Sequence, residues 1–468
     1  MHRKILNVRG RLLKRIQYTW PFVLMLPMAG AQASGFALIE QSASGQGNAF
    51  SGAATSAEDP SVMYFNPAAM TLVKGRQSTL GLHYIHPKAS FTNQGSKLPT
   101  GVVGGALTGP NDNGGQNGYV PNLYYLQHLN PDVVIGLGIN APFGLSTEYN
   151  PNWVGRYHAV KSDLKTVNVN PSIAWRLDNK WSFGAGVSAQ YVDVTLSSAV
   201  DMGSACLAVA AAAIGAGGAA PPACAAAAPQ GSDGFANLTG NDWSYGFNLG
   251  VLFEPTQDSR IGLSYRSKVS QNVSGDAVFT GPAAVLATLR AASGSFVDTT
   301  LHADVTLPES TSLGYYLQIN PDLAVMAGWT WTHWSRFKEL RITYDSSQAD
   351  TVTTESWNDS NRFSLGANYR LDPALMLRGG LAYDETPVPD ATYRTARIPG
   401  NSRRWVSLGL AWDMTPSSRL DVGYSHLFVG KTSIDNTLKS SVPTLNSTLT
   451  GIYDAEVDIV SAQVNWRY

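Results

Sequence analysis

The residues that could carry out chemistry are few and lie far apart in the sequence. Beyond the first few positions the histidines occur singly, as His83, His86, His128, His158, His302, His333 and His426. A serine nucleophile needs a histidine beside it to act as a base. Ser425 precedes His426, but adjacent residues of a strand point to opposite faces. We therefore expect no catalytic residues and no cofactor, and a protein that is not an enzyme.

Arg341 is a candidate for binding a charged group. It lies in the alternating segment Leu340-Arg341-Ile342-Thr343. If the apolar neighbours face lipid, Arg341 faces the interior of the protein. An unpaired buried charge is costly, so Arg341 needs a partner there. That partner is either the carboxylate of a ligand or an Asp or Glu side chain of the protein itself.

The composition favours a β-barrel in a membrane. Of the 468 residues 14% are charged, compared with about 25% in ordinary soluble domains. Aromatic residues make up 10%, glycines number 45, and the mean hydropathy is −0.10. This hydropathy is too low for a bundle of membrane helices, whereas barrel strands average one apolar face with one polar face. A soluble all-β protein is the alternative, and the net charge of −1 gives no indication of nucleic-acid binding.

The first 33 residues are typical of a secretory signal peptide. A basic region ends at Arg15, a short apolar stretch runs from Trp20 to Gly30, and Ala31-Gln32-Ala33 is a small-x-small cleavage sequence. We predict cleavage after Ala33. The apolar stretch is shorter than the ~20 residues that a spanning helix needs. An uncleaved membrane anchor is the alternative.

Cys206 and Cys224 are the only cysteines, and they lie in one predicted loop. An exported chain enters an oxidising compartment, so we expect a disulfide between them, with free thiols as the alternative. Closing a loop of this size would stabilise it by ~3 kcal/mol in the chain-entropy model. No histidine lies nearby in the sequence, so a metal site is not expected. The loop between them is rich in Ala and Gly, and it is either a helical pair or low-complexity sequence.

The chain after the signal peptide divides into two parts. Residues 34–76 are rich in Ser, Gly and Ala and show no sustained alternation. From Gln77 to Tyr468 apolar and polar residues alternate with the period of a strand. The apolar face often ends in Trp or Tyr, as aromatic girdles at the two lipid–water boundaries would require. One such face contains Trp243, Tyr245, Phe247, Leu249, Val251 and Phe253.

The connections between these strands alternate in length. Six short turns rich in Asn, Asp and Pro separate the strands. Seven longer segments lie near residues 93–119, 144–162, 199–240, 276–299, 346–357, 386–400 and 431–452. The sequence thus predicts about fourteen antiparallel strands over residues 77–468. The barrel must be closed because backbone groups in lipid have no water to bond.

Several motifs, taken in order, resemble the FadL family of outer-membrane transporters. The start Ser34-Gly35-Phe36-Ala37-Leu38 and the segment Phe50-Ser51-Gly52 resemble the family's opening, and Asn66-Pro67-Ala68 resembles the motif of its N-terminal plug, or hatch. Further matches follow at Leu307-Pro308-Glu309, Trp334-Ser335-Arg336-Phe337, Thr386-Pro387-Val388-Pro389 and Asp421-Val422-Gly423-Tyr424. The resemblance implies a fourteen-stranded barrel in the outer membrane of a Gram-negative bacterium. It also implies that residues 34–76 form a hatch in the lumen.

The resemblance also implies a route for a hydrophobic ligand. Ligand would be captured at the outer loops and released sideways through the barrel wall. Phe36 and Arg341 are the expected ligand-binding residues, and Asn66, Pro67 and Ala68 are the expected gate of the hatch. Without the resemblance these three residues could equally form an ordinary turn. The fifth strand, Gln190 to Val194, lacks the second basic residue that a carboxylate ligand would favour.

Three functions remain open on these grounds. The first is uptake of long-chain fatty acids or similar amphiphiles. The second is uptake of neutral aromatic or aliphatic hydrocarbons, which the fifth strand favours. The third is a general porin, against which the hatch argues. The expected partners are the hydrophobic ligand, outer-membrane lipid and the barrel assembly machinery, for which the terminal aromatic Tyr468 resembles the signal. We expect a monomer.

Overall fold

The computed structural model describes residues 35–99, 104–440 and 442–468. The predicted signal peptide and its cleavage site therefore lie outside the described residues. Within them, nineteen strands form one antiparallel sheet that closes on itself, because β1 pairs with both β2 and β19. No helix in the described ranges is long and apolar enough to cross a membrane.

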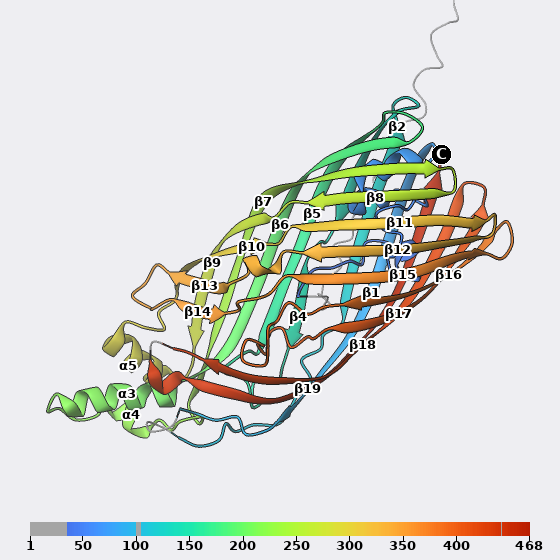
Figure 1. Cartoon of the computed structure of the whole chain (residues 1–468). Helices are drawn as coiled ribbons and strands as arrows, with labels where there is room; N and C mark the ends of the chain where they lie inside the picture. The colour runs from blue at the N-terminus through green and yellow to red at the C-terminus, as the bar shows by residue number, and fades with distance from the viewer. Residues whose placement is uncertain (1–34, 100–103, 441) are drawn as a thin grey trace, which may run out of the picture.

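Fourteen passes of the chain make up the described wall of this barrel (Figure 1). Nine passes are single strands: β1 (Arg76–Asn93), β2 (Gly118–His128), β5 (Lys161–Arg176), β6 (Trp181–Asp201), β7 (Asp233–Thr256), β16 (Leu375–Asp384), β17 (Arg403–Thr415), β18 (Ser418–Leu438) and β19 (Ser447–Arg467). The predicted number of about fourteen strands is confirmed.

The other five passes are interrupted, which the sequence analysis did not predict. They are β3 (Val133–Asn140) with β4 (Gly144–Glu148), β8 (Ser259–Arg266) with β9 (Val269–Thr280), β10 (Thr299–Leu307) with β11 (Ser310–Asn320), β12 (Leu323–Thr332) with β13 (Glu339–Tyr344), and β14 (Thr351–Thr354) with β15 (Ser360–Arg370). Pro142 and Pro308 lie in two of the breaks, and proline cannot donate to a strand ladder. Two of the motifs quoted above, around Pro308 and Trp334, thus mark breaks in the wall.

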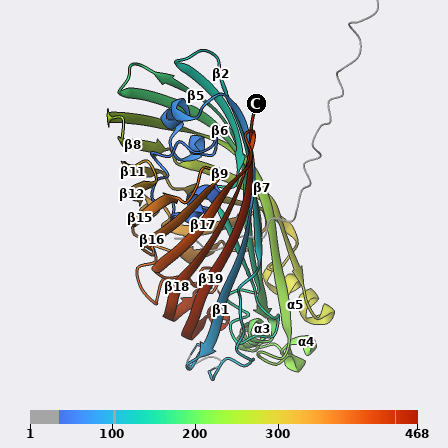
Figure 2. The ribbon, with the colours of Figure 1, turned by 90° about the vertical axis from the view of Figure 1, so that its right-hand side faces the viewer.

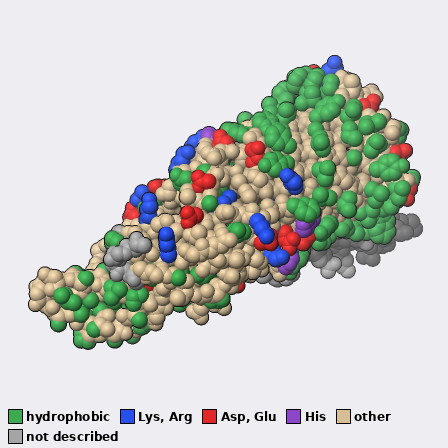
Figure 3. Space-filling view, turned by 60° about the horizontal axis from the view of Figure 1, so that its bottom comes forward, with side chains coloured by type: hydrophobic (Ala, Val, Ile, Leu, Met, Phe, Trp, Pro, Cys, Tyr) green, Lys and Arg blue, Asp and Glu red, His purple; other side chains and the backbone are tan. Residues whose placement is uncertain are grey.

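The apolar side chains form a band on the outside of the barrel. On β7, Trp243, Tyr245, Phe247 and Leu249 are exposed, whereas Asn248 is buried in the lumen. Figure 3 shows that hydrophobic side chains gather over the end of the barrel with the short turns, and that charged side chains lie at the rim of that end and again further out. This is the arrangement of a barrel with lipid on one face and a polar lumen on the other.

The helices form two main groups, one inside the ring of strands and one beyond its far end. The segment before β1 contains α1 (Ala43–Gly47), α2 (Val62–Phe65) and the 3-10 helix η1 (Pro67–Leu72), and it lies inside the ring of strands (Figure 2). At the far end α3 (Met202–Gly215), α4 (Pro222–Ala226) and α5 (Ala283–Ser293) lie together beyond the strands (Figure 1). Two short 3-10 helices, η2 (Trp334–Arg336) and η3 (Pro443–Leu445), complete the described helices.

Candidate functional site

Glycines in the wall make room for the segment inside the barrel. A Cβ atom at Gly250 would lie 2.0 Å from Oδ1 of Asn66, and one at Gly184 would lie 2.4 Å from the nitrogen of Ala68. A Cβ atom at Gly262 would lie 2.0 Å from the oxygen of Ala54. Real Cβ atoms do not approach other atoms so closely. The wall is therefore glycine-rich where residues 35–75 press against it.

The predicted gate residues begin the helix η1. Asn66 has an extended backbone, and its Oδ1 accepts from the nitrogen of Ala68 at 3.0 Å, so it caps the helix, with Pro67 at the first helical position. The Asn66 amide also donates to the carbonyl oxygens of Ala54 (2.8 Å) and Val251 (3.1 Å). The motif therefore joins two parts of the inner segment to β7. Its role as a gate remains a prediction.

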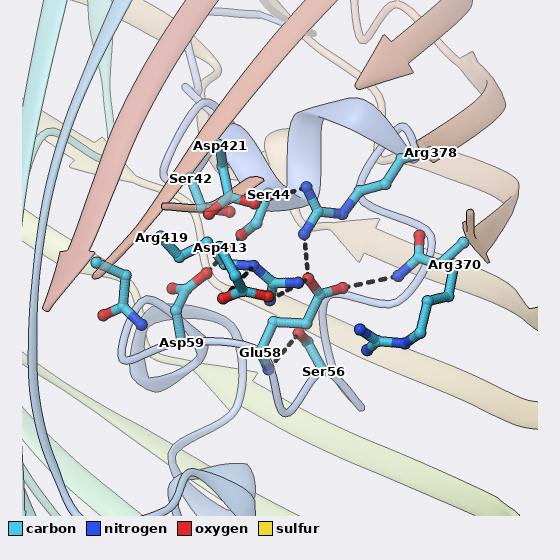
Figure 4. A network of polar contacts seen from close by, with 12 residues as sticks. Ser42, Ser44, Ser56, Glu58, Asp59, Arg370, Arg378, Asp413, Arg419 and Asp421 are labelled. Carbon is cyan, nitrogen blue, oxygen red and sulfur yellow. Dashed lines mark hydrogen bonds and ion pairs between the residues drawn. The ribbon is translucent and has the colours of Figure 1, made fainter. Parts of the chain in front are cut away.

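A buried ionic network holds the inner segment to the wall near the short turns (Figure 4). The carboxylate of Glu58 is bonded by Arg378 of β16, and it accepts from Asn368 Nδ2 at 2.7 Å. Arg378 also donates to Asp421 of β18 at 2.7 Å, and Arg419 lies 3.7 Å from Glu58. Removing one partner of a buried ion pair costs about 3–5 kcal/mol. This network therefore anchors the inner segment firmly at that end.

The other end of the inner segment covers the break in the third pass of the chain, between β3 and β4. The nitrogen of Leu38 donates to Pro142 (2.8 Å), and the nitrogen of Gly144 donates to Phe36 (2.9 Å). The ladder between β2 and the third pass ends at the pair Leu123–Ile139, and in the described chain β4 pairs along its length with β5. Residues 36–38 therefore lie across an interruption in the barrel wall.

Phe36 lies in a buried cluster of aromatic rings. Its ring centroid is 4.8 Å from that of Trp334, 5.8 Å from Phe337, 5.9 Å from Trp357 and 6.0 Å from Phe143. Trp334 lies in the break between β12 and β13, and Trp357 lies in the break between β14 and β15. The breaks let these large rings leave the wall and fill the lumen. Ligand binding by Phe36 remains a prediction.

A lumen pocket of about 130 Å³ lies directly beneath this cluster. Phe143 and Trp334 of the aromatic cluster line this pocket. The inner segment contributes Leu38, Ile39, Phe50 and Phe65, and the wall contributes Ser264, Ser310 and Thr330. Two arginines and one acid also line it: Arg266 of β8, Arg362 of β15 and Asp384 of β16. The pocket thus combines apolar surface with charged groups at one side.

The two arginines of the lumen pocket also bind the inner segment. Arg266 donates to the carbonyl of Tyr64 at 2.7 Å and its guanidinium lies 4.2 Å from the centre of the Tyr64 ring. Arg362 donates to the carbonyl of Ala49 at 2.9 Å. In the alternating sequence of β15, Arg362 falls on the polar face with Ser364, opposite to Phe363 and Leu365. Nothing in the sequence indicated which segment or cavity it meets there.

A second groove of about 190 Å³ lies among the outer loops. Apolar side chains line it, among them Leu196, Leu238, Phe279, Phe296, Leu340 and Ile342. The helices α3 and α5 pack against the same apolar cluster. Leu340 packs against both this cluster and the aromatic cluster around Phe36. The aromatic cluster therefore separates the outer groove from the lumen pocket.

The prediction that Arg341 faces the lumen is wrong. On β13 it is Ile342 that is buried and lines the outer groove, while Arg341 is exposed and pairs with Glu339 (2.8 Å) and Asp350 (2.9 Å). This strand lies outward of the lipid-facing band, so its apolar residues pack inward and its charged ones face water. The charge of Arg341 is balanced by acidic side chains, as in the alternative given above.

Charged groups at the breaks tie the outer strands together. Arg336 binds both carboxylate oxygens of Glu309, at 2.6 and 2.5 Å, and His333 lies 2.8 Å from the same carboxylate. Burial would raise the pKa of Glu309, but the hydrogen bonds from Arg336 and His333 outweigh it and lower that pKa to about 2. In the tenth pass, burial raises the pKa of Glu355 to about 8, against the hydrogen bond from Trp357 and the charge of Arg397.

The loop cysteines are joined in the structure. Cys206 of α3 and Cys224 of α4 form a disulfide, with their Cα atoms 4.8 Å apart. Both side chains are buried in the apolar cluster that α3 and α5 share. In the described residues no group of three or more His, Cys, Asp or Glu side chains is placed to hold a metal ion.

These features define a class of protein: a closed membrane barrel whose lumen is filled by its own N-terminal segment and lined with apolar pockets. Residues 25–468 match the family model described as "Outer membrane protein transport protein (OMPP1/FadL/TodX)". The chain belongs to this family. It is an outer-membrane protein of a transport family and not of an enzyme family, so the resemblance and the predicted location are confirmed.

Individual relatives agree with this assignment. The chain is 32% identical over 405 residues to the "Long-chain fatty acid transport protein" of Escherichia coli O6:H1, which covers 85% of this chain and 87% of the relative. It is 30% identical to "Outer membrane protein P1" of Haemophilus influenzae, over 86% of this chain and 88% of the relative.

Solved structures share the fold. A FadL homologue from Pseudomonas aeruginosa superposes with a TM-score of 0.81 at 23% identity, over 92% of this chain and 99% of the homologue. The toluene transporter TodX of Pseudomonas putida gives a TM-score of 0.63 at 19% identity, over 87% of this chain and 94% of TodX.

Proposed function

We propose that this protein takes up long-chain fatty acids or similar amphiphiles across the outer membrane. The observation that carries the proposal is the lumen pocket, where apolar side chains meet the guanidinium groups of Arg266 and Arg362. Such a pocket suits a ligand with a long apolar chain and an anionic head. Keeping that chain in water costs about 25 cal/mol per Å² of apolar surface, so a dry route is favoured.

The proposed route has four stations along the barrel. Ligand is captured in the outer groove beneath α3 and α5, passes the aromatic cluster at Phe36, and enters the lumen pocket. It leaves sideways at the break in the third pass, beside Pro142 and Phe143, which also line the lumen pocket. Residues 34–76 act as the hatch, and Asn66, Pro67 and Ala68 seat it against the wall.

Uptake of neutral hydrocarbons is the second candidate function. The fifth pass carries no Arg or Lys from Gln190 to Val194, and Asp384 brings a negative charge to the lumen pocket. Both features weaken the case for an anionic ligand. A structural relative named as a toluene transporter has the same fold.

The closed sheet supports two further proposals about partners. Pairing of β1 with β19 leaves no free edge for another chain, so we propose that the protein works as a monomer. Tyr468 follows the last strand with an exposed ring, and its backbone nitrogen donates to the carbonyl oxygen of Arg76 at 2.9 Å. We propose it as the terminal signal for the barrel assembly machinery.

Growth and uptake assays test the proposed function. A strain that lacks this protein should grow poorly on oleate and recover when the full chain is restored, with matching uptake of labelled oleate. Arg362→Ala should weaken oleate binding by the ~1.5–3 kcal/mol of a hydrogen bond to a charged group, with little change for a hydrocarbon of similar length. Arg341→Ala is the matched control and should leave both ligands unaffected. Restored growth on toluene or alkanes but not on oleate would favour the second candidate.

A further inference from the structure

A second large cavity lies between the hatch and the wall, at the end of the barrel with the short turns. This basal cavity has a volume of about 650 Å³, and Pro321 and Asp322 of the turn between β11 and β12 line it. Ala53 and Phe65 of the hatch line both the basal cavity and the lumen pocket, so hatch side chains separate the two. Small-molecule pockets typically measure about 300–1,000 Å³. The basal cavity can therefore hold a small molecule while the hatch stays in place.

Three arginines reach the basal cavity from separate parts of the wall. Arg260 lies on β8, Arg370 on β15 and Arg419 on β18, and all three line the cavity. Their strands belong to the seventh, tenth and thirteenth passes of the chain. The positive charges are therefore spread around the wall of the cavity and do not form a patch on one strand.

Two of these arginines have no acidic partner. The guanidinium of Arg260 lies over the ring of Tyr316, directly opposite on β11, at 3.8 Å from the ring centre. Stacking occupies the flat face of a guanidinium and leaves the N–H donors at its edge available. Arg370 makes only a long hydrogen bond, of 3.5 Å, to the carbonyl oxygen of Pro373. Among the residues that the structure describes, no carboxylate forms an ion pair with Arg260 or Arg370.

The third arginine, Arg419, is buried without close bonds. Its side chain is 6% exposed, and its Nε has no hydrogen-bond partner in the described part of the chain. The carboxylates of Asp413 and Glu58 lie 3.6 and 3.7 Å away, beyond hydrogen-bond distance. Asp413 is also bound by Arg467, at 3.0 Å. A buried donor without a partner is costly, so Arg419 is placed to donate to an anion in the cavity.

The acidic residues of the described lining are too few to neutralise these arginines. They are Glu58 and Asp322. Glu58 is already bonded by Arg378 and by Asn368 (Figure 4), and Asp322 is exposed to water at its turn. Lys74 also lines the cavity and adds a further positive charge. The basal cavity therefore has an excess of positive charge and suits an anionic ligand.

We propose that the basal cavity binds an oxyanion, the carboxylate or phosphate group of a ligand that enters from the periplasmic side. Short turns mark that side of an outer-membrane barrel. Arg260, Arg370 and Arg419 bind the group, because guanidinium donors match the geometry of carboxylates and phosphates. This inference goes beyond the proposed function, because the site lies on the other side of the hatch from the lumen pocket.

The bound oxyanion also contacts the hatch. Ser56 lines the basal cavity, and its hydroxyl oxygen accepts from the nitrogen of Glu58 at 3.4 Å. The hydroxyl hydrogen of Ser56 is available for a ligand, because a hydroxyl can donate and accept at once. The oxyanion therefore joins the hatch to the wall and holds the hatch in its seated position.

Two sources can supply the oxyanion. One is a small soluble anion, which needs only the charged and hydroxyl groups of the cavity. The other is the head group of an amphiphile, whose chain would lie against Phe65, Met326 and Met376 in the same cavity. Inorganic phosphate and dodecyl phosphate are probes for the two sources.

The first test measures binding of inorganic phosphate to the full-length purified protein in a neutral detergent, by phosphorus NMR. Arg260→Gln and Arg370→Gln should each weaken binding at least about tenfold, the loss of one hydrogen bond between charged groups. Arg341→Gln is the matched control, because Arg341 is exposed on β13 and pairs with Glu339 and Asp350. It should leave phosphate binding at the wild-type value.

Dodecyl phosphate distinguishes the second source. If it binds and Arg260→Gln weakens that binding, while inorganic phosphate does not bind, the ligand is the head group of an amphiphile. The site is overturned if neither probe binds, if both cavity variants bind as the wild type does, or if Arg341→Gln loses as much affinity as they do. None of these outcomes depends on oleate uptake, so the proposed function stands or falls separately.

The second test follows hydrogen exchange of the hatch peptide around Ser56. Phosphate should slow this exchange in the wild type, because the bound oxyanion links the hatch to the wall. Arg260→Gln should abolish the slowing at the same phosphate concentration. Unchanged or faster exchange in the wild type with phosphate would overturn the contact with the hatch and, with it, the proposed site.

Discussion

Arg341 and Arg362 show how differently two arginines on alternating strands can be placed. Arg341 lies on β13 beyond the lipid-facing band, where it meets water and two acidic side chains. Arg362 lies on β15 at the outer edge of that band, where it is buried against the hatch and the lumen pocket. A charge in the first position contributes little to stability, because water screens it. A charge in the second is costly to leave unpaired. Asp384 lies directly opposite Arg362 on β16, and Arg362 also donates to the hatch.

The disulfide between Cys206 and Cys224 can be tested directly. Mass spectrometry of unreduced peptides from outer membranes should find the two cysteines in one linked pair. The link should stabilise the α3–α4 pair by ~3 kcal/mol, because it restricts the unfolded loop. Cys224→Ser should therefore increase hydrogen exchange in α3 while leaving the strands unaffected. Two thiols that can both be alkylated in the native membrane would contradict the prediction.

At the level of elements, the contact between hatch and wall depends on glycines as much as on charges. Gly184, Gly250 and Gly262 lie on three successive passes and face Ala54 to Ala68 of the hatch. Their missing side chains let the hatch backbone approach the strands closely. The ionic anchor at Glu58 acts elsewhere on the same segment. The hatch is therefore held at several separate places, and a gate can open at one of them without release at the others.

Gly250→Val should unseat Asn66 from β7. The added Cβ atom would overlap Oδ1 of Asn66, 2.0 Å away, so η1 must shift. We expect larger single-channel conductance in planar bilayers and faster exchange of the Asn66 region. Gly379→Val is the matched control, because nothing lies within 4 Å of a Cβ atom added there. Equal conductance and exchange in the two variants would show that η1 does not need a glycine at position 250 to pack against β7.

At the scale of the whole molecule, the barrel is a closed wall whose interior is occupied by its own chain. The closure satisfies the backbone of every lipid-facing strand, which the membrane requires. In the part of the chain that the structure describes, the hatch and the aromatic cluster occupy much of the lumen. A hydrophobic ligand that follows the proposed route must therefore pass side chains that move.

Deleting residues 34 to 71 should convert the protein into an open pore. The strands supply the closed wall, so the barrel should still fold, which circular dichroism can check. Single-channel conductance in planar bilayers should rise, because the hatch no longer occupies the lumen. The intact protein under the same conditions is the reference. Unchanged conductance in a folded deletion variant would show that residues 34 to 71 are not a plug.

The sequence by itself determined the class of fold. Period-two alternation is a local property, so residues such as those of β7 revealed strands, an apolar face and a polar face without any tertiary information. The lengths of the connections likewise predicted about fourteen passes. Cys206 and Cys224 could be paired in advance because the chain has no other cysteines.

Only the tertiary structure decided what the polar side chains face. Arg362 and Ala49 are 313 positions apart, and Glu58 and Arg378 are 320 apart, so no local pattern relates them. Alternation also cannot say which face is the lumen once a strand leaves the lipid, which is why the orientation of Arg341 was wrong. Trp334 and Trp357, at the breaks between β12 and β13 and between β14 and β15, pack against Phe36 from distant segments. Those contacts exist only because the barrel closes around its own N-terminal segment.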